Sequence, residues 1–279
     1  MTYDVLGAGA LNYAPCRYGN SRILFRGPKR RLDLPYVAFI GGTKTYGKFV
    51  ETPFPALIER DLGMTCVNFG IANAGIDVFL NDPMVLDAAN GAEATVLQMF
   101  GAQNLSNRFY TVHPRRNDRF VNASPLLTSI YPEVDFSEFH FTRHMLMNLH
   151  QVSAERFGAV RQELQTAWTA RMQLLLRRIE GQVLLLWFSD HEPPPNARAE
   201  LNPAECGDPM FVTREMVDAL AQHAARFIEV TTSEVAREAG TEGMVFGEME
   251  ALAAHQVMGP LAHQEASQMV GEALREWLP

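Results

Sequence analysis

Apolar runs alternate with amphipathic segments along the first half of the chain. Short apolar strands are predicted at residues 36–40, 66–68 and 94–100, and each is followed by Gly, Asn or Gln. Helices are predicted between them, at about residues 53–62 and 82–90. This strand–helix alternation indicates a parallel sheet with right-handed crossovers.

The second half of the chain continues the same alternation. An apolar stripe predicts a long amphipathic helix at residues 153–180. The strand that follows, residues 183–188, is entirely apolar, which is typical of a central strand covered on both faces. A helix at 214–225, a strand at 227–230 and a closing helix at 263–277 complete an α/β fold with a five-stranded, mostly parallel sheet.

Two segments depart from the pattern. Residues 1–35 contain many Gly, Pro and Tyr but also Leu24 and Phe25, so we expect an N-terminal extension packed on the domain. Residues 105–151 contain prolines, aromatics and histidines, which predict an insertion of loops and short helices that covers the strand ends like a lid. The remainder, within residues 36–279, is expected to form one α/β domain.

Composition narrows the class of protein. The net charge of −8 argues against a nucleic-acid partner, because phosphate neutralisation needs a basic face. No apolar run approaches the roughly 18 residues that cross a bilayer, and the N-terminus resembles no signal peptide. The cysteines are isolated, without the spacing of a zinc site or a disulfide framework. We therefore expect a cytoplasmic protein without a membrane span.

The basic residues are unevenly distributed, with one group in the N-terminal extension and another after residue 114. Such groups can steer or hold an anionic ligand. The alternative is that they are ordinary solvated surface side chains. The residues in question are Arg26, Lys29, Arg30, Arg31, Arg115, Arg116 and Arg119.

Polar groups follow the first three predicted strands where each ends. Because the carboxyl ends of parallel strands meet at one edge of a sheet, these groups should converge on one ligand site. Backbone N–H groups and amides there would form an oxyanion hole. The alternative is that the glycines make turns and the asparagines cap helices. The candidate donors are Gly42, Gly70, Asn73, Gly75, Gln103 and Asn104.

In order and spacing, these blocks resemble SGNH/GDSL-type hydrolases across residues 36–279. Thr43 stands where that family has its nucleophilic serine, 68–75 and 101–104 resemble the second and third blocks, and His263 resembles the histidine before the last helix. The resemblance implies a flavodoxin-like three-layer sandwich with Thr43 as nucleophile and His263 as base. The whole chain is also similar to an alphaproteobacterial protein family of unknown function.

Three positions depart from the family pattern. The methyl group of Thr43 crowds the approach of its hydroxyl to a substrate. Pro260 replaces the aspartate that orients the histidine, a role whose loss costs about 10⁴ in rate in a serine protease. Gln103 replaces the asparagine of the third block, unless a one-residue shift brings Asn104 into place. The carboxylates that could orient His263 instead are Asp190, Glu248 and Glu250, and the auxiliary candidates are Lys44, Thr45, Asp190 and His191.

Three functions remain open from the sequence. The first is an esterase, or an acyl or acetyl hydrolase or transferase, acting on a small ester or carbohydrate. The second is a catalytically lapsed module that binds a glycan or serves as a structural part of an assembly. The third is a nucleotide- or sulfonucleotide-binding transferase, because residues 42–49 nearly match the phosphate-binding Gly-x-x-x-x-Gly-Lys-[Ser/Thr] loop, with Phe49 at the hydroxyl position.

No cofactor and no metal are expected. His140 and His144 are four residues apart and would share a face if their segment were helical, which would suit a metal. No third ligand at a telling spacing accompanies them.

Overall fold

The computed structural model describes residues 9–195 and 202–278, so the first eight residues of the predicted N-terminal extension lie outside the described residues. A five-stranded sheet in the order β2-β1-β3-β6-β7 forms its centre. All neighbouring strands in this sheet are parallel. The strands are β1 (Tyr36–Ile40), β2 (Thr65–Asn68), β3 (Ala94–Gln98), β6 (Val183–Ser189) and β7 (Arg226–Thr231).

This strand order is that of a flavodoxin-like doubly wound sheet, in which the winding direction reverses between β1 and β3. The predicted fold class is therefore confirmed. Ligands of such sheets bind outside the carboxyl ends of the strands, at this reversal. Thr43 comes soon after the end of β1 and therefore lies beside this reversal.

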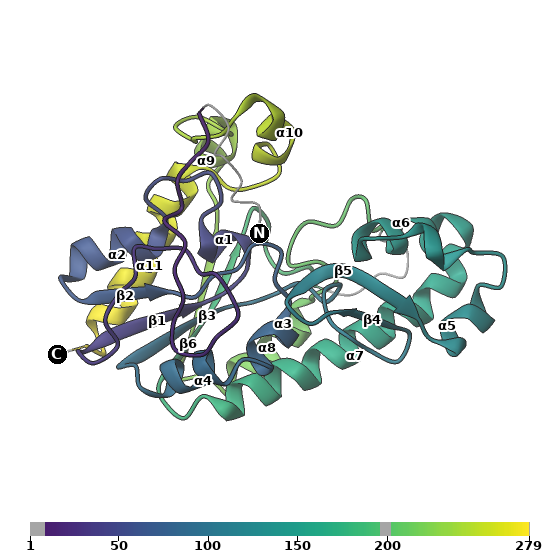
Figure 1. The fold of residues 1–279 in the computed structure, drawn as a ribbon, viewed down its shortest axis with the longest axis horizontal. Helices are drawn as coiled ribbons and strands as arrows, with labels where there is room; N and C mark the ends of the chain where they lie inside the picture. The colour runs from purple at the N-terminus through teal and green to yellow at the C-terminus, as the bar shows by residue number, and fades with distance from the viewer. Residues whose placement is uncertain (1–8, 196–201, 279) are drawn as a thin grey trace.

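Helices cover both faces of the sheet (Figure 1). β1 shows why both faces are apolar: Ala38 and Ile40 belong to one core, while Val37 and Phe39 belong to the other. Successive strand residues point to opposite faces, so a fully apolar strand supplies two cores. One face carries α2 (Phe54–Leu62), α9 (Glu234–Ala239) and α11 (Pro260–Arg275); the other carries α3 (Ile76–Leu80), α4 (Pro83–Asn90), α7 (Ala154–Arg178) and α8 (Arg214–Ala221).

Local capping explains where the long helices begin. The Ser153 hydroxyl accepts a hydrogen bond from the N–H of Arg156 at the start of α7. Asp82 caps α4 in the same way. These residues satisfy backbone donors that a helix leaves free at its first turn. The closing helix begins at Pro260, three residues before the predicted start, because Pro is well tolerated in the first turn of a helix.

The insertion contains more regular structure than predicted. Its strands β4 (Tyr110–His113) and β5 (Arg116–Ala123) form an antiparallel hairpin, whereas the sequence indicated only loops and short helices. The hairpin escaped prediction because β5 is rich in polar residues and its pairing with β4 is irregular. After the hairpin come α5 (Pro125–Ile130), the 3₁₀ helix η1 (Phe136–Glu138) and α6 (Thr142–Val152).

The described part of the N-terminal extension contributes Tyr18 and Phe25 to the core. The Arg26 guanidinium beside them is buried and donates to the backbone carbonyls of Tyr46, Gly47, Val50 and Glu51. Arg26 thus stabilises the chain after β1, and it is not the anion-binding side chain that the charge pattern allowed.

Five short elements outside the insertion were not predicted. Besides α3 and α9, these are α1 (Thr43–Tyr46), the 3₁₀ helix η2 (Glu248–Glu250) and α10 (Ala251–Ala254). Within the described residues, no helix combines the length and apolar character that a membrane span requires.

Candidate functional site

Thr43 lies at the start of α1, directly beyond β1. Gln98, the last residue of the neighbouring β3, is buried beneath this turn. Its Oε1 atom accepts hydrogen bonds from the N–H of Gly42 at 3.2 Å, the N–H of Thr45 at 3.1 Å and the hydroxyl of Thr45 at 2.7 Å. A side-chain oxygen therefore occupies the place where a phosphate-binding loop would hold its ligand, so this engagement does not support the nucleotide-binding alternative.

The other two candidate glycine amides also have side-chain partners. The N–H of Gly70 donates to Asn68 Oδ1 at 2.8 Å, and the N–H of Gly75 donates to Asn117 Oδ1 at 3.1 Å. As oxyanion donors, all three glycine N–H groups would have to give up these hydrogen bonds.

The glycines are needed for close packing. A Cβ atom on Gly70 would lie 2.3 Å from the backbone nitrogen of Tyr46, and one on Gly75 would lie 1.6 Å from the carbonyl oxygen of Asn104. Both distances are shorter than real Cβ contacts. The end of β2 and the start of α3 therefore approach their neighbours so closely that no larger residue fits.

Asn73 connects Thr43 to the insertion. The N–H of Asn73 donates to the Thr43 hydroxyl oxygen at 2.9 Å, and that hydroxyl donates to Asn73 Oδ1 at 3.2 Å. On its other side, Asn73 Nδ2 donates to Asp118 Oδ2 at 3.4 Å. Asn73 has a φ of 57°, in the left-handed region that Asn tolerates better than most residues.

Asp118 belongs to β5 of the inserted hairpin, and its side chain is half-buried. Burial raises the pKa of this carboxyl above its usual range, while the hydrogen bond from Asn73 opposes that rise. A carboxyl group with a raised pKa, one amide away from a hydroxyl, is a functional-site feature that the sequence alone did not indicate.

The third predicted block is also held by the protein. The Asn104 side chain donates to the carbonyl of Asn73 at 3.2 Å and accepts from the hydroxyl of Thr142 at 2.7 Å. Gln103 Nε2 donates to Asp208 at 3.4 Å, while Gln103 Oε1 is buried and has no partner among the described residues. The insertion thus meets the strand ends through Thr142 as well as Asp118.

The Lys44 side chain is half-buried, and its ammonium group donates to the backbone carbonyls of Phe188 and Asp208, each at 2.6 Å. Burial lowers its pKa, which the charges of Asp208 and Asp190 oppose. Asp190 is exposed just beyond β6, and His191 Nε2 lies 3.9 Å from it, too far for a hydrogen bond. Lys44 therefore fastens α1 to the end of the central strand.

His263 lies in the core between the sheet, α2 and α11. The ring is 1% exposed and packs against Phe54 and Phe188, with ring centroids 5.9 and 5.6 Å away. Its Nδ1 atom accepts a hydrogen bond from the N–H of Phe54 at 3.2 Å. That N–H belongs to the first residue of α2, where a helix leaves its donors unpaired.

Burial lowers the pKa of His263 to about 3, so its ring is neutral near pH 7. Because Nδ1 accepts a hydrogen bond, the proton of the neutral ring belongs on Nε2. Among the described residues, no carboxylate is hydrogen-bonded to this ring, so the orienting roles suggested for Asp190, Glu248 and Glu250 find no counterpart there.

Sequence reasoning missed three side chains of this region: Gln98, Asn117 and Asp118. Gln98 carried a signal, because it is a polar residue at the end of an otherwise apolar strand. Asn117 and Asp118 lie in a polar strand that was not predicted. Their approach to Gly75 and Asn73 depends on how the hairpin folds back.

Among the residues that the structure describes, no group of three or more His, Cys, Asp or Glu side chains is placed to hold a metal ion. His140 and His144 do not share a helix face, because α6 begins at Thr142, after His140. The His144 ring packs edge-on against Phe139 instead.

The fold and the residues at the strand ends together define a flavodoxin-like α/β protein with a cluster of polar side chains at the carboxyl edge of its sheet. The model of a protein family described as a domain of unknown function (DUF6473) matches residues 1–278. The chain belongs to this family.

Two solved structures are similar to the chain. The lipase Lip_vut3 from a goat rumen metagenome is 10% identical, with a TM-score of 0.41 over 86% of this chain and 97% of that one. A G-D-S-L family protein from Desulfitobacterium hafniense DCB-2 is 15% identical, with a TM-score of 0.37 over 85% of this chain and 99% of that one. No curated protein matches the chain.

Proposed function

We propose that this protein is an SGNH-like module that binds a small ester or carbohydrate at the carboxyl edge of its sheet and whose hydrolytic activity has lapsed. The observation that carries the proposal is the hydrogen bond from the Phe54 N–H to His263 Nδ1. A general base needs a free lone pair within reach of the proton that it abstracts. A neutral His263 with its proton on Nε2 has none to offer.

The state of the Thr43 hydroxyl supports the same proposal. Its proton is directed to the side-chain oxygen of Asn73, a neutral acceptor that does not activate a nucleophile. The glycine amides that would stabilise an oxyanion are bonded to Gln98, Asn68 and Asn117. What remains accessible is a half-buried hydroxyl beside an exposed amide, which suits hydrogen bonding to a polyhydroxylated ligand.

Hydrolysis of 4-nitrophenyl acetate and of acetylated glucose by the wild type and by Thr43→Ala tests the lapse of activity. We expect both proteins to hydrolyse these esters no faster than buffer alone does. Turnover by the wild type that Thr43→Ala abolishes would contradict the proposal.

Binding is measured separately, as chemical-shift changes of the labelled protein on addition of acetylated glucose or of free glucose. We expect the changes to involve Thr43 and Asn73 and to weaken in Thr43→Val, which keeps the shape of the side chain but removes the hydroxyl. Thr166→Val is the control, because Thr166 is an exposed threonine on α7 whose hydroxyl donates to Gln162 of its own helix.

A second candidate function is hydrolysis in which Asp118 takes the proton of the Thr43 hydroxyl through one water molecule, because the Asn73 amide between them cannot transfer it. Two observations favour it. Hydrogen bonds connect Thr43 to Asn73 and Asn73 to Asp118. Burial raises the pKa of the Asp118 carboxyl, toward the range that suits a general base near neutral pH. In that case, Thr43→Ala and Asp118→Asn would both abolish turnover while His263→Asn would retain it. The exposed Asp135, replaced by Asn, is the control for the loss of one carboxylate.

A further inference from the structure

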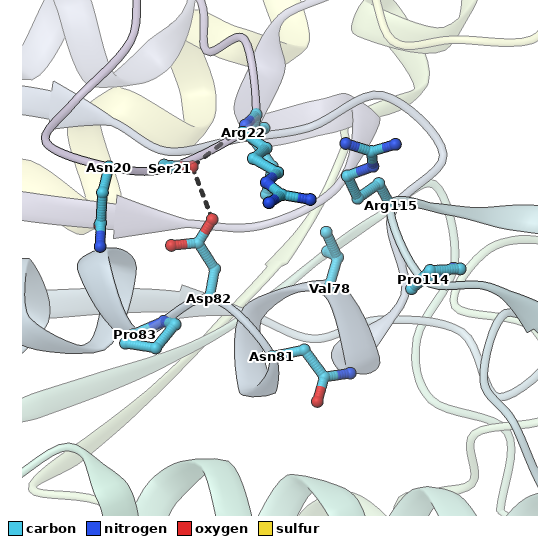
Figure 2. Close-up of a pocket in the computed structure, with 10 residues that line it drawn as sticks. Asn20, Ser21, Arg22, Val78, Asn81, Asp82, Pro83, Pro114 and Arg115 are labelled. Atoms are coloured by element: carbon cyan, nitrogen blue, oxygen red, sulfur yellow. Dashed lines mark hydrogen bonds between the residues drawn. The ribbon is translucent and has the colours of Figure 1, made fainter.

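A second concave site lies apart from Thr43. It is a pocket of about 230 Å³ between the N-terminal extension, the junction of α3 and α4, and the turn of the inserted hairpin (Figure 2). The lining comes from residues 20–23, Val78, 81–83 and 114–115. α3 adjoins both sites: Gly75, just before it, and Val78 donate backbone hydrogen bonds to Asn117, while Val78 and Asn81, just after it, line the pocket.

Two arginines from distant parts of the chain, Arg22 and Arg115, border this pocket, and Figure 2 shows their side chains on the same side of it. Both are exposed, and neither makes a hydrogen bond, ion pair or ring contact through its guanidinium group with another described residue. Two other arginines of the extension differ in this respect: Arg30 is paired with Glu59, and Arg31 with Asp33.

Asp82 is the carboxylate in the lining, and it is already engaged. One oxygen accepts from the hydroxyl of Ser21 at 2.6 Å, and the other accepts from the N–H of Met84 at 3.1 Å. Figure 2 shows the first of these bonds on the side of the pocket away from Arg115. The lining therefore carries two guanidinium charges against one carboxylate, which makes the pocket attractive to an anion.

We propose that this pocket binds the phosphate group of a small phosphate monoester between Arg22 and Arg115. A guanidinium group presents donors in a planar fork that matches phosphate oxygens. One such fork satisfies a planar carboxylate, whereas two forks from different chain segments suit a tetrahedral dianion. At about 30 Å³ per water molecule, the pocket has room for roughly eight water molecules, so a phosphate group and a few further atoms fit.

The polar part of the ester would meet the side chains of Asn20 and Asn81, which also line the pocket. Amide groups donate and accept hydrogen bonds, so they suit the hydroxyls of a small polyol. This assignment does not depend on the function of Thr43.

Binding of inorganic phosphate and of glycerol 3-phosphate to the full chain tests the proposal by calorimetric titration, with sodium acetate at matched ionic strength as the comparison anion. We expect the wild type to prefer both phosphates to acetate. Each of Arg22→Gln and Arg115→Gln should weaken phosphate binding about tenfold or more, since each removes charge-assisted hydrogen bonds. Arg17→Gln is the matched control, because Arg17 is an exposed arginine of the same segment outside the lining.

Equal phosphate affinity in the wild type and the Arg22→Gln/Arg115→Gln double variant would overturn the site. An equal loss in Arg17→Gln would assign the effect to general charge and would overturn it as well. Acetate binding as tightly as phosphate would overturn the ligand class. Since both arginines are exposed, the ligand-free unfolding temperatures of the variants should match the wild type, which separates lost binding from lost folding.

Discussion

Gln98, Asn68 and Asn117 each place a side-chain oxygen on the N–H of a glycine near the carboxyl edge of the sheet. A buried N–H left without a partner costs about 1–3 kcal/mol, so these amides stabilise the turns in the absence of any ligand. A ligand that used the same N–H groups would have to displace them. This residue-level competition favours ligand binding through the Thr43 hydroxyl and the Asn73 side chain.

The buried histidine makes a prediction about pH. Because the folded-state pKa of His263 is about 3 and an unfolded histidine has a pKa near 6.5, acidification protonates the unfolded state first. The free energy of unfolding should therefore fall as the pH drops from about 6.5 toward 3, by at most about 1.4 kcal/mol per pH unit from this group. His263→Asn removes the titration and retains an acceptor for the Phe54 N–H.

Urea denaturation of the wild type and His263→Asn between pH 7 and 4 measures this difference. The wild type should lose more stability on acidification than the variant, and His255→Asn, which changes an exposed histidine, should behave like the wild type. Parallel pH profiles for the wild type and His263→Asn would show that His263 is protonated in the folded state as readily as in the unfolded one.

Two glycines in helical surroundings should respond in opposite ways to the same substitution. Gly75→Ala should destabilise the protein by about 2 kcal/mol or more, because its Cβ would meet the carbonyl oxygen of Asn104 at 1.6 Å and force α3 away from the third block. Gly158→Ala, within α7, should stabilise it by about 0.5–1 kcal/mol, because no atom lies within 4 Å of the added Cβ and Ala is the better helix former.

Thermal unfolding followed by circular dichroism compares the two variants with the wild type. A Gly75→Ala protein as stable as the wild type would mean that α3 moves freely against the loop at Asn104. Two sets of hydrogen bonds argue against such freedom: Asn117 of the insertion holds the N–H of Gly75, and Asn73 is bonded to both Asn104 and Asp118.

At the scale of the whole molecule, the insertion shares a core with the sheet. Tyr110 and Leu146 belong to the same buried cluster as Leu97, Leu185 and Trp187. We predict that Leu146→Ala, which removes a fully buried side chain, lowers the free energy of unfolding by about 2–5 kcal/mol. The loss should appear equally in tryptophan fluorescence, which reports on α7, the sheet and the C-terminal residues through Trp168, Trp187 and Trp277, and in circular dichroism.

Leu126→Ala on α5 is the control, because Leu126 is 48% exposed and its truncation should change stability by no more than about 0.5 kcal/mol. If Leu146→Ala shifted only part of the circular dichroism and left the tryptophan transition unchanged, the insertion would be a separate folding unit. Coincident transitions are the mark of one cooperative unit.

The amino-acid sequence by itself determined the fold class. Apolar runs such as residues 183–188 and the stripe of α7 are local patterns with the periods of strand and helix, so they predicted the order of the elements within a few residues. Alternation of those elements then restricted the sheet to a parallel arrangement. The sequence also marked Thr43 and the glycines of the following strand ends as neighbours, because parallel strands end at one edge.

Only the tertiary structure decided which polar groups face one another. His263 and the Phe54 N–H are 209 residues apart in sequence, and Asn73 and Asp118 are 45 apart, so no local pattern encodes either contact. The choice depends on how helices and the inserted hairpin pack, because a buried polar atom takes the nearest partner that packing provides. Packing therefore placed the ring of His263 on the first N–H of α2 and brought an unpredicted carboxyl group within one amide of the threonine.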